Sequence, residues 1–388
     1  SRIIDWEGNI LGEAPGGGET IIQATIDVEA LRRARSNATH NTIATNRYWV
    51  YADYFEDPEK QTWPVSSFSR ENPYQTLDQM HGISHATIQR LYSRGTFVPP
   101  GQEERVPLPF ETSLASKNND GRRYLKRYTV VCLQTDVHAM RNSEITHSKV
   151  QENTRAALAR NTELIDWACQ EPRYRPKLVC LSEFHLTGVP ETRALDDYMT
   201  MATELPGMVT EAYGAKAREH SIYICGGVFE SDPEWPGRMF NTTFLIGPDG
   251  NILLRYRKNN DFQVGMPCNT NPGDIYDIYK QRYGGKEAFF PVVDTELGRI
   301  GIMTCYDIRM AEVARMLALN GAEVIIHSTA EASGGEFVGA WQFAKQTRAF
   351  DNATYFISTN NGDTLGSARP RQRQRGMATK IIDFRGGI

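Results

Sequence analysis

Residues 298–309 read GRIGIMTCYDIR, and this stretch decides how the rest of the chain is interpreted. The apolar run at 299–303 predicts a short buried strand that stops just before Cys305. Apolar residues then recur at helical spacing over 310–319, and Asp307 is placed to cap that helix. A cysteine near a helix N-terminus meets unpaired backbone N–H groups and a positive partial charge, which favour the thiolate. On this stretch alone a buried structural thiol is the stronger alternative, because free cysteines are among the most buried residues.

Two other strand ends carry side chains that change this balance. Residues 177–181 form an apolar run that delivers Glu183, and residues 252–257 deliver Lys258 in the same way. Singly, each would be interpreted as a solvated charge at a loop entrance. A carboxylate, an ammonium and a thiol, each at a strand end, are together the groups that a hydrolase with a cysteine nucleophile requires.

The residues that flank these three positions resemble the signatures of a known family. The segments LSEF at 181–184, YRKN at 256–259 and TCYDIR at 304–309 are similar to the three signatures of the nitrilase superfamily, also called carbon-nitrogen hydrolases. The resemblance covers most of residues 128–388 and also residues 1–35. It identifies the family strongly and the substrate weakly.

The chain from Tyr128 onward alternates apolar strands with amphipathic helices, which predicts a layered α/β domain. The resemblance implies that the layers follow the order α-β-β-α, a four-layer sandwich of the nitrilase type within a single catalytic domain. We expect residues 124–388 together with 1–36 to form this domain. Residues 37–123 are polar, with clustered aromatic residues and few aliphatic ones, so we expect an extension or arm that contributes oligomer contacts.

The order of the segments differs from the order found in the family. The chain opens with a strand, a turn, a strand and a helix, a unit that comes near the end of the family's catalytic domain. Residues 386–388 read directly into residues 1–5 as one family-like segment. We therefore predict a circularly permuted order, which closely spaced termini tolerate. The alternative is a repeated strand, because KIID at 380–383 is similar to RIID at 2–5.

The resemblance implies a role for each residue of the catalytic set. Cys305 attacks the carbonyl carbon, while Glu183 takes the thiol proton and later gives it to the departing amine. Lys258 and the backbone N–H of Tyr306 stabilise the tetrahedral intermediate. No metal or cofactor takes part in this scheme.

Two further positions receive weaker assignments. Arg309 is a candidate for binding a substrate carboxylate, but an ion pair at the helix start is the commoner fate of such an arginine and is preferred. Relatives often carry a second glutamate after the lysine. The loop at 259–274 contains Asp261 and Asp274 but no glutamate, so no residue is assigned to that role.

The expected function is hydrolysis of a non-peptide carbon–nitrogen bond in an amide or N-carbamoyl amide, through a cysteine thioester that releases ammonia or an amine. Conversion of a nitrile to an acid and ammonia is the close alternative. The Tyr-Asp pair after Cys305 favours amides, because nitrile-hydrolysing relatives more often place Trp and Glu there. An alternative of another class is a non-catalytic or redox-sensing oligomeric scaffold whose thiolate is oxidised. Glu183 and Lys258 favour the enzyme, since a sensor needs only an exposed thiol of low pKa.

Composition argues against several other classes. The 388 residues carry a formal net charge of −4, so there is no basic surface for nucleic acid, and the arginines at 369–375 are assigned to a solvated loop or a subunit contact. No apolar run approaches the roughly 18 residues that cross a bilayer. The six cysteines show no metal-ligand spacing and lie mostly in apolar runs, as free thiols do in the cytoplasm. His185 and His327 are assigned to the core. We expect a cytoplasmic homo-oligomer, implied by the resemblance, that acts on a small molecule.

Overall fold

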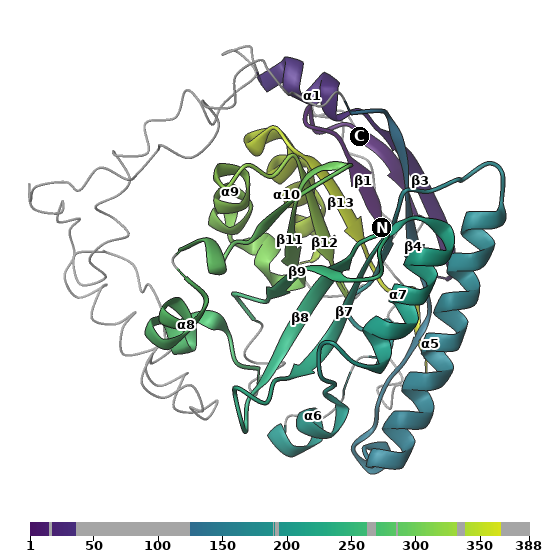
Figure 1. The fold of residues 1–388 in the computed structure, drawn as a ribbon, viewed down its shortest axis with the longest axis vertical. Coiled ribbons are helices and arrows are strands. Elements are labelled where there is room, and N and C mark those ends of the chain that lie inside the picture. Colours follow the sequence, from purple (N-terminus) through teal and green to yellow (C-terminus); the bar gives the residue numbers. More distant parts are fainter. Residues whose placement is uncertain are drawn as a thin grey trace, which may run out of the picture.

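The computed structural model describes residues 1–14, 18–35, 125–188, 190, 194–261, 269–284, 286–331 and 338–365. The predicted arm at 37–123 and the arginine-rich segment at 369–375 lie outside these residues. The description that follows therefore concerns the layered part of the chain (Figure 1).

The strands follow the apolar runs of the sequence closely. They are β1 (Arg2–Ile4), β2 (Ile10–Glu13), β3 (Thr20–Ile26), β4 (Tyr128–Gln134), β5 (Val137–His138), β6 (Leu178–Leu181), β7 (Tyr223–Ser231), β8 (Met239–Ile246), β9 (Ile252–Arg257), β10 (Val292–Thr295), β11 (Gly298–Thr304), β12 (Val324–Ser328), β13 (Tyr355–Thr359) and β14 (Thr364–Leu365). They form two six-stranded sheets, in the orders β10-β11-β12-β13-β1-β2 and β3-β4-β6-β7-β8-β9, and β5 pairs with β14 separately.

The helices lie between and beside these strands. They are α1 (Val28–Arg35), α5 (His147–Gln170), α6 (Leu195–Met201), α7 (Met208–His220), α8 (Tyr276–Tyr283), α9 (Ala311–Leu319) and α10 (Val338–Asn352). Short 3-10 helices are η2 (Asn142–Glu144), η3 (Pro272–Ile275), η4 (Lys286–Ala288) and η5 (Cys305–Arg309). Among the described helices, none combines the length and the apolar composition that a bilayer crossing requires.

The two sheets pack face to face with helices outside each of them (Figure 1). Alternate side chains of a strand point to opposite faces, and β4 shows this clearly. Its Val130 and Cys132 are buried in the core between the sheets, whereas Val131 and Leu133 pack in a second core with residues of α5 and α7. Helices α9 and α10 contact β11 and β13 of the other sheet. The predicted α/β fold with four layers in the order α-β-β-α is therefore confirmed.

The first strands of the chain belong to both sheets. Strand β1 pairs antiparallel with β13, with Arg2 opposite Ser358, and β3 pairs antiparallel with β4, with Ile22 opposite Cys132. Strands β1 and β3 are thus integral to the layered structure. The circular permutation stays a prediction, because residues 366–388 lie outside the described part of the chain.

The parallel strands β4 and β6 of one sheet and β11, β12 and β13 of the other end at one edge of the sandwich. Two contacts join the sheets there. Ser328 Oγ donates to Leu181 O over 2.7 Å, and the hydroxyl oxygens of Thr243 and Thr304 lie 2.8 Å apart. Because Leu181 and Thr304 end their strands, the residues that follow them are held next to one another.

Candidate active site

The structure brings the three predicted residues together at this edge. Glu183 follows β6, Lys258 follows β9 and Cys305 follows β11. Lys258 Nζ lies 2.8 Å from Glu183 Oε1, and both side chains are almost completely buried. The Glu183 carboxylate is near enough to the Cys305 thiol to raise its pKa. Three apolar strands separated in sequence therefore deliver an acid, a cation and a thiol to one place.

The backbone at Cys305 has an unusual conformation. Its φ is +45°, a left-handed value that L residues with a side chain rarely adopt, directly after the extended Thr304. His327 Nε2 lies 3.0 Å from Cys305 O; because a carbonyl only accepts, Nε2 donates this bond. His327 Nδ1 lies 2.9 Å from Ser358 Oγ, so the histidine is anchored on its other side. These contacts hold the cysteine in the sharp turn between strand and helix.

The expected cap on the following helix is absent in the described structure. Residues 305–309 form the 3-10 helix η5, and α9 starts only at Ala311 with Met310 as its N-cap residue. The prediction that Asp307 caps this helix is therefore wrong. Its carboxylate instead accepts a hydrogen bond from Thr304 N over 3.1 Å and so caps the 3-10 helix η5, inside the turn that carries Cys305.

The two oxygens of Glu183 have different surroundings. Asn241 Nδ2 donates to Oε1 over 2.7 Å, and Lys258 Nζ donates to the same oxygen over 2.8 Å. Oε2 is buried and has no N–H or O–H donor among the described residues. The lone pairs of Oε2 are thus available to the thiol of Cys305, which is what a general base requires.

Lys258 has a second acidic neighbour that sequence reasoning did not assign. Asp261 Oδ1 lies 3.3 Å from Lys258 Nζ, and both side chains are buried. Burial opposes the charge on Lys258, but the carboxylates of Asp261 and Glu183 outweigh it and hold the pKa of Lys258 well above its ordinary value. The spacing of three residues was the signal available in the sequence. The contact itself depends on how the chain turns after β9.

Asp261 is linked through Asn269 to β8, the strand whose Asn241 binds the Glu183 side chain. Asn269 Nδ2 donates to Asp261 Oδ2, and Asn269 Oδ1 accepts from the backbone N–H of Asn241 over 2.8 Å. The polar groups therefore form a closed ring that runs through Glu183 and Lys258. A ring of this kind restricts both side chains, because each member has partners on two sides.

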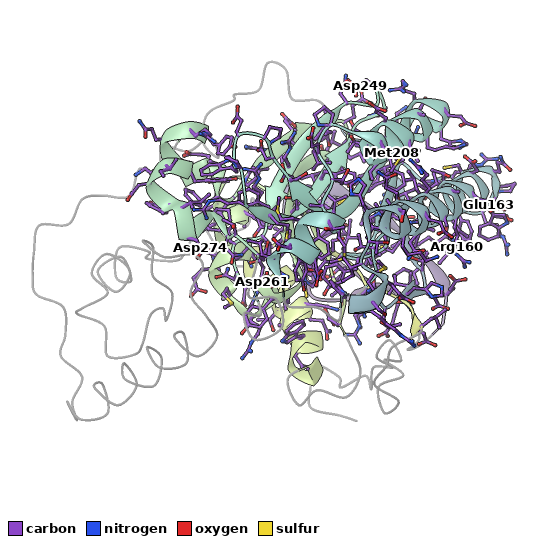
Figure 2. All side chains as sticks on the ribbon, turned by 90° about the horizontal axis from the view of Figure 1, so that it is seen from below. Arg160, Glu163, Met208, Asp249, Asp261 and Asp274 are labelled. Carbon is purple, nitrogen blue, oxygen red and sulfur yellow. The ribbon has the colours of Figure 1, made fainter. Side chains whose placement is uncertain are left out.

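The other aspartate of this loop, Asp274, binds the backbone of the loop. Asp274 Oδ2 accepts from the backbone N–H of Asn271 over 2.8 Å, and burial raises the pKa of Asp274 to about 6. Asp261 and Asp274 lie away from Arg160 and Glu163, which belong to the middle of α5 (Figure 2). Of the two candidates in the loop, Asp261 is the one that reaches the lysine.

The charge state of Cys305 differs from the expectation drawn from the sequence. Burial, and then the neighbouring Glu183 carboxylate, raise the pKa of the Cys305 thiol above its ordinary value of 9.0, although Lys258 acts in the opposite direction. The expected stabilisation of a thiolate by a helix N-terminus is therefore wrong. At neutral pH the thiol is protonated, so it must lose its proton to a base as it reacts.

This charge state predicts how Cys305 reacts with iodoacetamide as the pH changes. We expect the alkylation rate to keep rising above pH 9, because below the pKa the thiolate fraction grows about tenfold for each pH unit. Mass spectrometry of the peptide that contains Cys305, over a pH series in the folded protein, measures this rate. A plateau below about pH 8 would show instead that the thiolate is already formed at neutral pH.

The other predicted residues occupy different surroundings. Arg309 Nη1 donates to Tyr306 OH over 3.1 Å, and the guanidinium lies over the Tyr306 ring. Their predicted parts in substrate binding and in the oxyanion site stay predictions. His185 packs against Tyr213 and close to Gly226, and burial lowers its pKa to about 4. Both histidines are buried core residues, as expected, and His327 also binds the backbone oxygen of Cys305.

One further cluster in the described residues has the donor types that bind a metal ion. Asp166 of α5 and Glu219 and His220 of α7 place one donor atom each within 4.8 Å of one another. Lys216 Nζ lies 2.6 Å from Asp166 and 2.9 Å from Glu219, while His220 Nε2 lies 2.7 Å from Asp166. Since an ammonium already pairs with both carboxylates, we interpret the cluster as an ion-pair link between the two helices.

Comparison with known proteins agrees with this arrangement. Residues 148–388, more than half of the chain, match the family profile described as Carbon-nitrogen hydrolase. The chain belongs to the carbon-nitrogen hydrolase family. The resemblance to the nitrilase superfamily that the three signature segments predicted is thereby confirmed.

Among curated carbon-nitrogen hydrolases, the human omega-amidase NIT2 is 29% identical over 168 residues, which are 41% of this chain and 54% of that protein. The omega-amidase NIT2 of Bos taurus is 30% identical over 179 residues, 44% of this chain and 57% of that protein. This chain thus spans about half the length of the curated relatives it matches. Among solved structures, Nit3 of Saccharomyces cerevisiae, a member of branch 10 of the nitrilase superfamily, has 23% sequence identity and a TM-score of 0.45, covering 56% of this chain and 73% of that one.

Proposed function

We propose that this chain hydrolyses a non-peptide carbon–nitrogen bond of an amide or N-carbamoyl amide through a thioester on Cys305, releasing ammonia or an amine. One observation carries the proposal: Asn241 and Lys258 bind one oxygen of Glu183, and its other, buried oxygen has no hydrogen-bond partner among the described residues, while the carboxylate acts on the pKa of the Cys305 thiol. A thiol with a raised pKa is a weak nucleophile until a base removes its proton. Glu183 is in the position of that base.

In the first half of the reaction Cys305 Sγ forms a bond to the carbonyl carbon while its proton passes to Glu183 Oε2. The carbonyl oxygen gains negative charge, which the ammonium of Lys258 stabilises, as the backbone N–H of Tyr306 is predicted to do. The carbon–nitrogen bond then breaks as Glu183 gives the proton to the departing nitrogen. The products are ammonia or an amine and an acyl thioester on Cys305.

In the second half water attacks the thioester carbon and gives a proton to Glu183. The carbon–sulfur bond breaks, and the proton returns to Cys305 as the carboxylic acid leaves. Glu183 thus takes and returns one proton in each half-reaction, while Lys258 keeps its charge. The high pKa of Lys258 supports these separate roles, proton transfer by Glu183 and charge stabilisation by Lys258, since a permanent cation stabilises an oxyanion without exchanging protons.

The relatives support an amide as the substrate. The curated proteins named above are omega-amidases, which favours an amide over the nitrile alternative. The redox-sensing alternative is less well supported, because burial and Glu183 raise the pKa of Cys305, whereas a sensor thiol has a low pKa.

A substrate panel tests the proposed function. We expect ammonia release from at least one amide or N-carbamoyl amino acid, and intact mass during turnover should show an acyl group on the chain. Peptide mapping should place the adduct on Cys305. A panel of nitriles tested in parallel separates the nitrilase alternative, because a nitrile hydrolysed to ammonia by the same cysteine would require that assignment instead. If the Cys305→Ala variant still hydrolysed every class of substrate, the proposed mechanism would be contradicted.

The remaining predictions concern the assembly of the protein and its location. Formation of a homo-oligomer is supported by the outer face of α10, where Phe343 and Phe350 are each nearly half exposed although they are large and apolar. The two residues are seven positions apart and therefore lie on the same side of the helix. A cytoplasmic location rests on the cysteine content alone.

A further inference from the structure

We propose that Asp307 is a positioning residue: its two carboxylate oxygens bind the turn that carries Cys305 and the segment that carries Lys258, and so fix the nucleophile relative to the ammonium. The inference rests on the proposed function and adds to it a residue two positions after the nucleophile. Asp307 is completely buried. It makes its contacts to elements of both sheets.

One oxygen of Asp307 links the two elements directly. Oδ2 accepts from the backbone N–H of Thr304 over 3.1 Å, immediately before the nucleophile. The same oxygen accepts from Tyr256 OH over 2.8 Å, on the strand that ends before Lys258. A single atom therefore bridges β11 of one sheet and β9 of the other.

The second oxygen holds the chain on the far side of Lys258. Oδ1 accepts from both Asn260 N, at 2.9 Å, and Asn260 Nδ2, at 3.0 Å. Tyr256 and Asn260 lie two residues before and two residues after Lys258. Asp307 thus holds the lysine segment at both ends, while Thr304 ties the same carboxylate to the nucleophile turn.

The electrostatics match this geometry. Burial raises the pKa of Asp307 to about 6, and Lys258 is the first group that acts against this rise, so the carboxyl is ionised at neutral pH. All four contacts are donors to the carboxylate, and an ionised carboxylate only accepts. Asparagine cannot replace it, because its NH₂ group would face two donors.

The test removes these contacts in steps from the full chain. Tyr256→Phe and Asn260→Ala each delete one donor on the lysine side, and Asp307→Asn removes the negative charge and places an NH₂ group against two donors. We expect kcat on an amide that the wild type accepts to fall about tenfold for each single-donor variant and about 100-fold for Asp307→Asn, with smaller changes in KM, because small misplacements of reacting groups cost rate steeply. The alkylation rate of Cys305 at a fixed pH near 9 is the second measurement.

The alkylation rate of Cys305 distinguishes a displaced Lys258 from a general loss of packing. The attraction of Lys258 favours the thiolate, so displacing the lysine should slow alkylation of Cys305, by about tenfold for each unit by which the pKa rises. A merely loosened fold would speed it, because the burial that disfavours the thiolate would be relieved. Tyr355→Phe is the matched control. It removes a buried tyrosine hydroxyl that donates to Asp27 O, away from the catalytic residues, and should change neither kcat nor alkylation.

The outcomes distinguish this inference from the proposed function. Slower alkylation in Tyr256→Phe together with a lower kcat supports the positioning role. Normal or faster alkylation in both Tyr256→Phe and Asn260→Ala, with unchanged kcat, overturns it even if amides are hydrolysed. If no substrate is turned over but both variants slow alkylation, the positioning role stands and the proposed function fails. Tyr256→Phe keeps the test decisive if Asp307→Asn does not fold.

Discussion

We expect Glu183→Gln to lower kcat for amide hydrolysis by about 10²–10⁴-fold, the range typical for loss of a general acid–base group. The glutamine carbonyl can still accept from Asn241 and Lys258, so the hydrogen bonds to one oxygen survive. The other position becomes an NH₂ group, which cannot take a proton from Cys305. Steady-state ammonia release from wild type and variant at equal concentration measures the effect.

A glutamate that precedes a strand of the other sheet provides the control for this experiment. Glu323 precedes β12, is also buried, and accepts from Arg32 Nε over 2.6 Å. Glu323→Gln weakens an ion pair without touching the catalytic groups, so it should lower the unfolding temperature and leave kcat unchanged. Equal losses of kcat in the two variants would assign the effect of Glu183→Gln to folding and contradict its role as the base.

Lys258→Met should reduce both activity and stability strongly. Loss of the oxyanion-stabilising charge is expected to lower kcat by about 10²–10³-fold. The substitution also leaves the buried carboxylates of Glu183 and Asp261 without their shared cation, and breaking a buried ion pair in this way costs about 3–5 kcal/mol of unfolding free energy. Denaturant unfolding and steady-state kinetics on the same preparations measure the two losses.

A double variant separates the two losses. Adding Asp261→Asn to Lys258→Met removes one of the two unpaired charges, so we expect part of the stability to return while kcat stays low. Such coupling is characteristic of residues in one network. Strictly additive losses of unfolding free energy would contradict the shared ion-pair arrangement of Lys258 and Asp261.

The proximity of the proposed catalytic residues could be predicted from the sequence because each of them follows an apolar strand. Runs such as 299–303 predict a buried strand, and the polar residue that ends the run must then lie at a sheet edge. The family signatures identified Glu183, Lys258 and Cys305 for the same reason. What a local pattern cannot supply is which oxygen of Glu183 remains open, since that depends on Asn241, a residue of another strand.

The wrong predictions for this site, and the residues that were not predicted, also result from long-range contacts. The pKa of Cys305 was expected to fall because a helix was predicted to start next to it. The structure has the short 3-10 helix η5 there, and Glu183 brings a negative charge to the thiol. Asp261 was not assigned, and Asp307 was interpreted as a cap, because their partners come from segments distant in sequence or from an unpredicted turn. Long-range contacts of buried polar groups are the part of a site that local patterns leave open.

The pairing of β1 with β13 also matters while the protein is being made. Strand β1 is synthesised before β13, and the partner of Arg2 is Ser358. At about 5–20 residues per second, the partner strand follows on the order of tens of seconds later. Throughout that interval the edge of β1 that pairs with β13 lacks its partner, and unpaired strand edges associate readily with other chains. The sheet that carries Cys305 is therefore completed only after β13 has been synthesised.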